Sequence, residues 1–480
     1  MTDASTLTDS PDTKTAPSQM ERLKLYLAAL PESAKRLLAT EIERGRLHGN
    51  EIPGGDLILS VLQPDIRSLP GKAESRASDT SRLLFRSVEP FAIDERLDPK
   101  IKGRVTRDSL ANIWTWLSRD LVPAETKALE AKLQSAQTAE EPDIAQREVM
   151  VFIKTIRPAI DKAIEDGVQT EIGRKRLWSR LGDEHVLDDL KDVLRIWSEA
   201  SNVAQVVNKT PNTIKNLADE GLANARALFD PIASGRPELL PILLALFQNR
   251  LVHRAQLARL AAAAVDSDDA IKIIAHPYRA AIDLVICDIE RAAIRAGAAL
   301  KAGKTDKVVA AVKEFHDSVR TLRTDVNMSG DGPWQKRVAK CRTELARLLT
   351  AEIEPIPGTM RRLLRSRQRD DFAVEPITED VVLEIEARLD ILTVARNCAA
   401  EIALNEVTLR VFTEIQGYLD PTLTKLLDSI RAAPDVDRSL KISQIEAAIR
   451  FSARIFGASY AQLLQKAADV AIRSDKAAVR

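Results

Sequence analysis

The chain of 480 residues is 45% apolar and 29% charged, a balance typical of a folded protein with two or three domains and not of a disordered chain. Aromatic residues make up only 4%, and Ala, Leu, Arg, Glu and Ile dominate, so the composition favours helices over sheets. The 70 basic and 70 acidic side chains cancel, which excludes a uniformly basic nucleic-acid binder, so any such role requires a local basic patch.

The first 105 residues are predicted to be only partly helical. Residues 1–17 are rich in Ser, Thr, Asp and Pro, a composition typical of disorder. Residues 18–62 have helical apolar spacing, with Pro31 at a first-turn position, and are predicted to form a small helical module. Residues 63–105 are polar and interrupted by prolines, which indicates a long linker between two bodies.

Helical periodicity is nearly continuous from residue 106 to residue 330, so this range is predicted to be one helical domain. Gly, Pro or Asp residues of the kind that cap or end helices separate the segments. Helices are expected at approximately 123–138, 140–165, 183–199, 211–220, 237–263, 277–302 and 305–325, and the next helix, beyond this domain, at 333–353.

Residues 331–480 are predicted to form a second helical domain with long amphipathic helices. The clearest stripe runs from Val382 to Ile402, where apolar residues recur every three or four positions. Another apolar-periodic helix, "ISQIEAAIRFSARIFGASYAQLLQKAADVAI", closes the chain. No alternating strand pattern exceeds a few residues, so the predicted fold is all-α, a multi-helix array or bundle.

Targeting signals and cysteine chemistry point to the cytoplasm. The N-terminus is polar and lacks the apolar stretch of a secretory signal. The longest apolar run, residues 238–247, is about half the roughly 20 residues that span a bilayer. Cys287, Cys341 and Cys398 are far apart and show no CxxC spacing, so they are expected to be reduced thiols.

A helix-turn-helix-like pattern lies at residues 203–217, within "SNVAQVVNKTPNTIKNLADEGL". Ala204 occupies the small-residue position, Asn208 the turn, and Ile214 and Leu217 the apolar positions that anchor the second helix. Any stack of helices uses the same local rules at a bend. The pattern is therefore interpreted first as a structural bend, with DNA binding as the alternative.

In that alternative the second helix, with Thr210 as its N-cap, presents outward-facing polar residues to a DNA groove. Asn can read adenine bidentately. The stretch contains two lysines and two carboxylates, whereas phosphate-contacting motifs usually carry a basic excess. The DNA-contacting residues of this alternative are Asn212, Thr213, Lys215 and Asn216.

The most basic segment is residues 336–369, with ten Lys or Arg against three Glu, a local net charge of +7. Arginine forks bind carboxylates and phosphates bidentately, so an acidic protein surface is the expected ligand, with nucleic acid or anionic lipid as weaker alternatives. A solvated, salt-bridged helix is the structural interpretation of the same residues. The candidate partner-binding residues are Arg361, Arg362, Arg365, Arg367 and Arg369.

One glycine-rich stretch comes close to a phosphate-binding loop. Gly303, Lys304 and Thr305 match the end of G-x-x-x-x-G-K-[ST], but the first glycine is displaced by one residue. A helix and not a strand is predicted before it. Gly303 is therefore interpreted as a helix C-cap.

Two polar groups within predicted helices could belong to a pocket. Asp283 lies in an apolar helix and is predicted to pair with Arg279, four residues earlier. Asn397, Glu401 and Asn405 are spaced by four and are predicted to share one helix face. The five histidines show neither HExxH nor ExxH spacing, so no metal is expected.

These features favour a non-enzymatic cytoplasmic scaffold or adaptor that binds a protein partner, with no cofactor. The sequence leaves self-association open. One alternative is a DNA-binding regulator that uses residues 203–217. A second alternative is a helical enzyme or small-molecule binder with a pocket lined by Asp283, Asn397 and Glu401.

Overall fold

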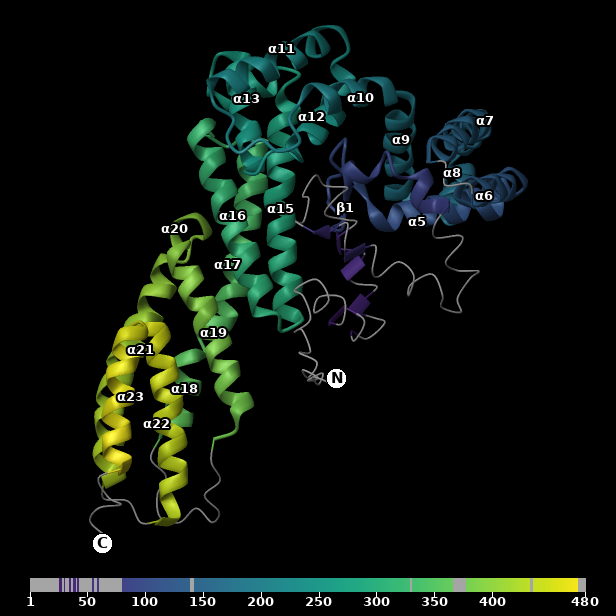
Figure 1. The fold of residues 1–480 in the computed structure, drawn as a ribbon. Coiled ribbons are helices and arrows are strands. Elements are labelled where there is room, and N and C mark those ends of the chain that lie inside the picture. The colour runs from purple at the N-terminus through teal and green to yellow at the C-terminus, as the bar shows by residue number, and fades with distance from the viewer. Residues whose placement is uncertain are drawn as a thin grey trace, which may run out of the picture. The chain divides into compact units, whose positions relative to one another are not determined.

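The computed structural model describes residues 80–473 except 139–141, 329, 366–376 and 432–434, and separate positions between 26 and 59. Its α-helices run from α5 to α23, and its two strands, β1 (Ala92–Ile93) and β2 (Val105–Thr106), have two residues each. The predicted all-α fold is therefore confirmed (Figure 1). The predicted disordered tail, residues 1–17, and residues 63–79 of the predicted linker lie outside the described residues.

The chain forms two compact units that interleave in sequence. The first contains residues 1–92, 107–201 and 211–213, and the second contains residues 93–106, 202–210 and 214–480. Residue 330, an expected domain boundary, lies inside the second unit.

Part of the predicted linker is packed. Residues 80–88 are mostly helical, a 3-10 turn covers Glu89–Phe91, and Leu84, Val88 and Phe91 are almost fully buried. These three residues are spaced by four and three and so form one apolar face. The polar segments on either side make this short pattern hard to recognise in the sequence.

From residue 107 onward, the described part of the first unit contains five α-helices and one π-helical turn. Its helices are α5 (Arg107–Trp116), α6 (Pro123–Thr138), α7 (Pro142–Val168), α8 (Glu171–Leu181) and α9 (Glu184–Ser198), with the turn at Leu117–Leu121. Helices α6, α7 and α8 pack in sequence order, and α8 also contacts α5 and α9. Helix α9 buries Val186, Leu190, Val193 and Trp197 along one face, and Trp197 stacks on Phe85 with 5.9 Å between ring centroids.

The second unit begins within α10 (Ala200–Lys209) and continues through seven helices, of which α12, α13, α16 and α17 pack against α15. In chain order these are α11 (Asp219–Gly235), α12 (Leu240–Gln248), α13 (Leu257–Val265), α14 (Ala270–Ile274), α15 (Arg279–Lys301), α16 (Thr305–Asp325) and α17 (Pro333–Ile353). All residues of α12 except Pro241 are buried, so the longest apolar run of the sequence is a core helix.

The rest of the second unit is a bundle of antiparallel helices (Figure 1). It contains α18 (Ile356–Leu364), α19 (Glu379–Asn397), α20 (Ala399–Ile402), α21 (Asn405–Arg431), α22 (Asp435–Ile455) and α23 (Ala458–Arg473). Two expected long helices are broken here. Cys398 (φ −105°, ψ 10°) separates α19 from α20, and Ala403 (φ +59°) then ends α20 in the left-handed region. Gly457 (φ +95°) separates α22 from α23, because a left-handed residue cannot continue a helix.

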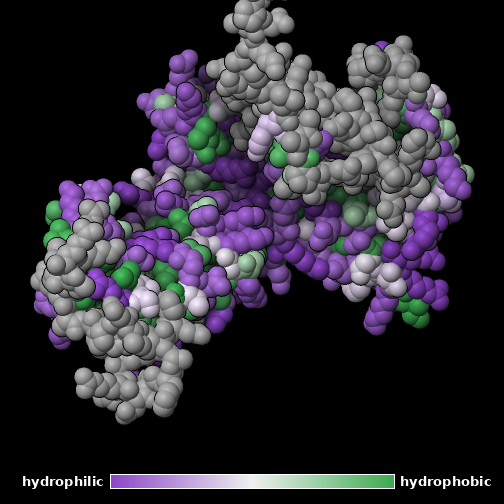
Figure 2. Space-filling model, turned by 60° about the horizontal axis from the view of Figure 1, so that its bottom comes forward, coloured by the Kyte–Doolittle hydropathy of each residue, from purple (hydrophilic) through white to green (hydrophobic). Residues whose placement is uncertain are grey.

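None of the described helices combines the length and apolar character that crossing a membrane requires. Figure 2 shows one face of the molecule, on which hydrophobic residues form small, scattered spots among hydrophilic ones.

Candidate binding surfaces

The predicted Arg cluster is engaged within the chain only in part. Arg361 pairs with Glu414 of α21 and lies over the ring of Tyr418, 5.9 Å from its centroid. The Arg362 guanidinium donates to Thr359 Oγ1 at 3.3 Å, and the Arg365 carbonyl accepts a hydrogen bond from Gln444 Nε2 at 3.1 Å. Arg367 and Arg369 lie outside the described residues. Of the three described arginines, Arg361 thus has a carboxylate partner, whereas the guanidiniums of Arg362 and Arg365 are exposed and have none within the described residues.

The predicted second helix of the helix-turn-helix pattern, residues 211–220, is wrong. Helix α10 ends at Lys209, residues 211–218 form no helix, and α11 begins at Asp219. Ile214 instead makes a parallel bridge: its N–H donates to the Arg250 carbonyl at 2.7 Å, and its carbonyl accepts from Val252 N–H at 2.9 Å. Backbone pairing with a distant segment replaces the local helix.

The four predicted DNA-contacting residues are exposed but lie on this extended stretch: Asn212, Thr213, Lys215 and Asn216. Asn216 Oδ1 accepts a hydrogen bond from Gln256 Nε2 at 3.0 Å. Thr210, the expected cap, donates its hydroxyl back to the Val206 carbonyl at 2.6 Å. The geometry that a groove-reading helix requires is thus not formed.

The glycine after α15 caps that helix, as predicted. Gly303 has a φ of +64°, and its N–H donates to the Leu300 carbonyl at 3.1 Å, while Lys304 N–H donates to the Ala299 carbonyl at 3.0 Å. This pair of bonds is a Schellman motif.

Asp283 belongs to a polar seam between α15 and α17. Its predicted pairing with Arg279 is confirmed, at 3.8 Å. Trp334 Nε1 also donates to Asp283 Oδ1 at 2.8 Å, and Arg337 lies 3.3 Å from Asp283 and 2.8 Å from Glu290. These bonds join two helices, as in an inter-helix seam.

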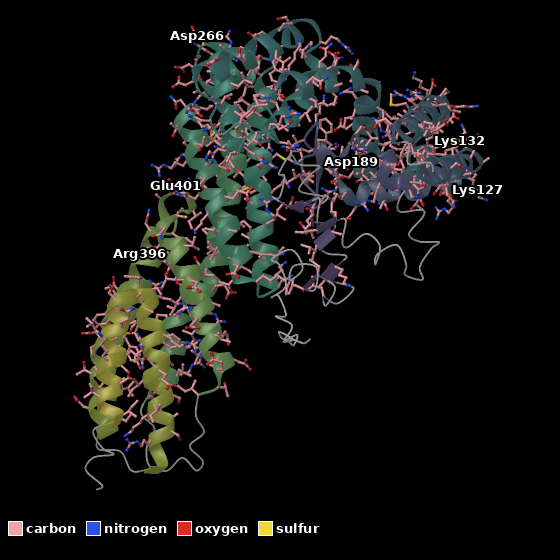
Figure 3. All side chains as sticks on the ribbon, viewed as in Figure 1. Lys127, Lys132, Asp189, Asp266, Arg396 and Glu401 are labelled. Atoms are coloured by element: carbon pink, nitrogen blue, oxygen red, sulfur yellow. The ribbon has the colours of Figure 1, made fainter. Side chains whose placement is uncertain are left out.

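The predicted polar row of Asn397, Glu401 and Asn405 is split by the α19–α20–α21 turns, so the three residues do not lie on one helix. Glu401, labelled in Figure 3, pairs with His316 Nδ1 of α16 at 2.9 Å. Arg342 Nε donates to the Glu401 backbone carbonyl at 2.6 Å and so provides a hydrogen-bond partner for a carbonyl at the C-terminal end of α20.

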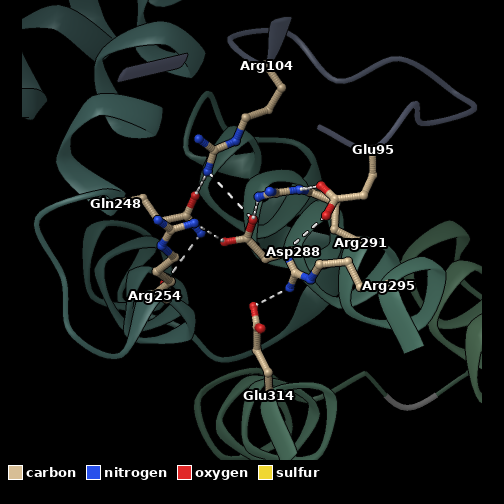
Figure 4. Close-up of polar contacts among 8 residues, drawn as sticks. All are labelled: Glu95, Arg104, Gln248, Arg254, Asp288, Arg291, Arg295 and Glu314. Atoms are coloured by element: carbon tan, nitrogen blue, oxygen red, sulfur yellow. Dashed lines mark hydrogen bonds and ion pairs between the residues drawn. The ribbon is translucent and has the colours of Figure 1, made fainter. Parts of the chain in front are cut away.

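A buried cluster of polar side chains in the second unit is centred on Asp288 of α15 (Figure 4). The side chain of Asp288 is 5% exposed, and its Oδ1 lies 3.0 Å from Arg291 Nη1 and 3.8 Å from Arg104 Nη2. Arg254 Nη1 approaches Oδ2 at 4.0 Å. Burial raises the pKa of Asp288, but the three guanidiniums outweigh burial and hold the pKa below its usual value.

A second carboxylate extends this cluster. Glu95 accepts from Arg291 Nε at 2.6 Å and from Arg295 Nη1 at 3.3 Å. Arg104 also donates to the buried amide oxygen of Gln248. Glu95 and Arg104 both lie in residues 93–106, so the ion pairs fasten this segment to α15. The cluster contains acids and cations but no activated nucleophile, which indicates a structural role.

The three thiols are free and poorly activated. Burial raises the pKa of Cys287 to about 12 and the pKa of Cys341 and of Cys398 to about 11. Because the thiolate is the reactive form, we expect N-ethylmaleimide at pH 8 to label the half-buried Cys341 first and to leave Cys287 unlabelled until the chain unfolds. Timed intact-mass measurements in buffer and in urea check this order. Equal labelling rates for Cys287 in both solvents would contradict it.

Helix α8, in the first unit, carries a dense group of exposed cations. It contains Arg174, Lys175, Arg176 and Arg180 but only one acid, Glu171, a net charge of +3, and all five are exposed. No side chain in the described residues forms a hydrogen bond or ion pair with the three arginines. Lys175 forms an exposed pair with Glu171 at 2.9 Å.

Local capping positions α8. Thr170 is the N-cap, and its hydroxyl accepts from Gly173 N–H at 3.0 Å, while Gly182 (φ +118°) ends the helix. Leu177 and Leu181 face the interior and leave the cations outside. Arg180 acts at longer range on Asp120, whose pKa is lowered mainly by its hydrogen bond with Arg119.

No protein-family model, curated protein or solved structure matches this chain.

Helix α8 is not among the helices predicted from the sequence, although signals for it exist. Gly173 in the first turn and the dense charge obscure the helical pattern of the segment. Thr170 as an N-cap, Leu177 and Leu181 spaced by four, and Gly182 at the end together identify the helix.

Proposed function

We propose that this chain is a non-enzymatic helical scaffold that binds a protein partner through the exposed cations of α8. The unpaired state of Arg174, Arg176 and Arg180 supports this proposal. Several arginines elsewhere in the described chain, such as Arg291, Arg337 and Arg450, pair instead with carboxylates of their own unit. An unpaired guanidinium keeps its capacity for bidentate binding of a carboxylate on another molecule.

The proposal is tested by quantitative affinity capture with crosslinking from native cells. The test variant is the full chain with R174E, R176E and R180E, which changes the net charge of α8 from +3 to −3. We expect a specific set of proteins to be lost, by at least about tenfold, because opposite charges would now be repelled. Circular dichroism checks that the helix content is unchanged.

A charge-matched control lies on α16. Lys307, Arg320 and Arg323 are exposed, and the triple variant K307E, R320E and R323E makes the same change in total charge. The control is expected to retain the captured proteins. Loss of the same proteins from both variants would show a general charge effect and would contradict a specific role for α8.

A further inference from the structure

The outward face of α8 is not purely charged. Ile172 is 67% exposed, and Lys175, Arg176 and Ser179 follow it at spacings of three, four and seven, so these residues share one face. Arg174 and Arg180 flank this face. An exposed isoleucine among cations is stabilised by a ligand that offers an apolar group together with negative charge.

A second exposed apolar residue lies close to Ile172 in the chain. Val168 is 43% exposed and is the last residue of α7, two residues before the α8 N-cap, Thr170. The turn from α7 to α8 therefore contributes two exposed apolar side chains next to the cationic face. This apolar area suits one or two anchor residues of a helix or peptide.

The same residues disfavour nucleic acid and membranes. Trp178, the one aromatic residue of α8, is half-buried, so its ring does not provide an open stacking platform for bases. Glu171, with a side chain 78% exposed, places a negative charge in the first turn, where a phosphate would otherwise be attracted. Two apolar side chains are too few to insert stably into a lipid surface.

We propose that α8 binds an acidic amphipathic helix of the partner protein, whose carboxylates contact Arg174, Arg176 and Arg180 and whose apolar side chain contacts Ile172. This inference rests on the proposed function and names the chemistry of the partner. Charge complementarity selects an acidic segment, and the exposed isoleucine selects one with an apolar face.

The test measures binding of two labelled 20-residue peptides to the full chain by fluorescence anisotropy. Both contain the same glutamates and leucines, but only one places the leucines on a single helix face. We expect the amphipathic peptide to bind about tenfold more tightly than the scrambled one. The variant with R174E, R176E and R180E is expected to weaken both peptides by about 30-fold.

Ile172 separates this inference from the general proposal. I172S is expected to weaken the amphipathic peptide by about tenfold and to leave the scrambled peptide unchanged. I271S, at another exposed isoleucine (76% exposed) on α14, is the matched control and should change neither. Circular dichroism confirms that each variant is folded.

Three outcomes decide between the proposals. If binding depends on the arginines but is unchanged by I172S and is equal for the two peptides, the partner segment is not amphipathic. Helix α8 then remains the docking helix. Arginine-dependent binding of a 20-nucleotide single strand, tighter than either peptide, would overturn both proposals in favour of nucleic acid. The absence of any α8-dependent protein in the capture experiment would overturn the proposed function itself.

Discussion

Replacement of Asp288 by asparagine is expected to lower the free energy of unfolding of the second unit by about 3 to 5 kcal/mol. Asp288 is the carboxylate shared by Arg104, Arg254 and Arg291, and the side chains of Arg104 and Arg291 are only 2% and 9% exposed. The asparagine keeps the shape but removes the charge, so Arg291 retains only Glu95 and the buried Arg104 loses its carboxylate neighbour. Urea denaturation followed by circular dichroism measures the loss.

Glu314 provides the matched control at the edge of the same cluster. It pairs with Arg295 at 2.7 Å, but its side chain is 45% exposed, so E314Q is expected to cost less than about 1 kcal/mol. Equal losses for both variants would show that burial of Asp288 does not determine its contribution.

The contribution of Asp288 has a defined pH dependence. Its pKa is lowered in the folded state, so it stabilises the fold above the unfolded-state pKa of about 4 and loses this effect as the pH falls through the folded-state pKa. The difference in the free energy of unfolding between the unsubstituted protein and D288N is therefore expected to be constant near neutral pH. It should shrink below about pH 4.

Local signals in the sequence predicted the parts of the fold that depend on neighbouring residues. The cap at Gly303 and the pair of Arg279 with Asp283 involve residues within four positions of each other, and both are confirmed. Such features follow from helix geometry and backbone conformation alone.

The errors occur where distant segments compete with local preferences. Residues 211–218 have an apolar pattern and a capping threonine, yet Ile214 pairs with the backbone near Leu251, and no propensity rule contains that information. The charge of the segment 336–369 likewise does not show that Arg361 pairs with Glu414, 53 residues away. Pairing partners at such separations are fixed by the tertiary fold.

The candidate site shows the same division. The capping residues and the buried leucines of α8 can be identified in the sequence. Whether its arginines are paired cannot, because pairing depends on which acids the fold brings near them. Net charge over a window therefore identifies regions rich in cations. Only the three-dimensional arrangement distinguishes available cations from those already paired.

G103A is expected to destabilise the second unit by about 2 to 4 kcal/mol, for two separate reasons. Gly103 has a φ of +81°, which costs an alanine about 1 kcal/mol. A Cβ atom at this position would also lie 2.8 Å from the Pro241 carbonyl oxygen of α12. That atom belongs to the backbone of a buried helix, so it cannot rotate away as a side chain could.

Gly303 separates the two contributions, because it has a similar φ of +64° but no atom within 4 Å of the added Cβ. G303A should therefore cost only the conformational part, about 1 kcal/mol. Denaturation curves of both variants give the cost of the close contact as their difference. If both variants lose the same stability, the backbone of α12 yields to the methyl group. The close approach of Gly103 to Pro241 would then make no separate contribution to the stability of the second unit.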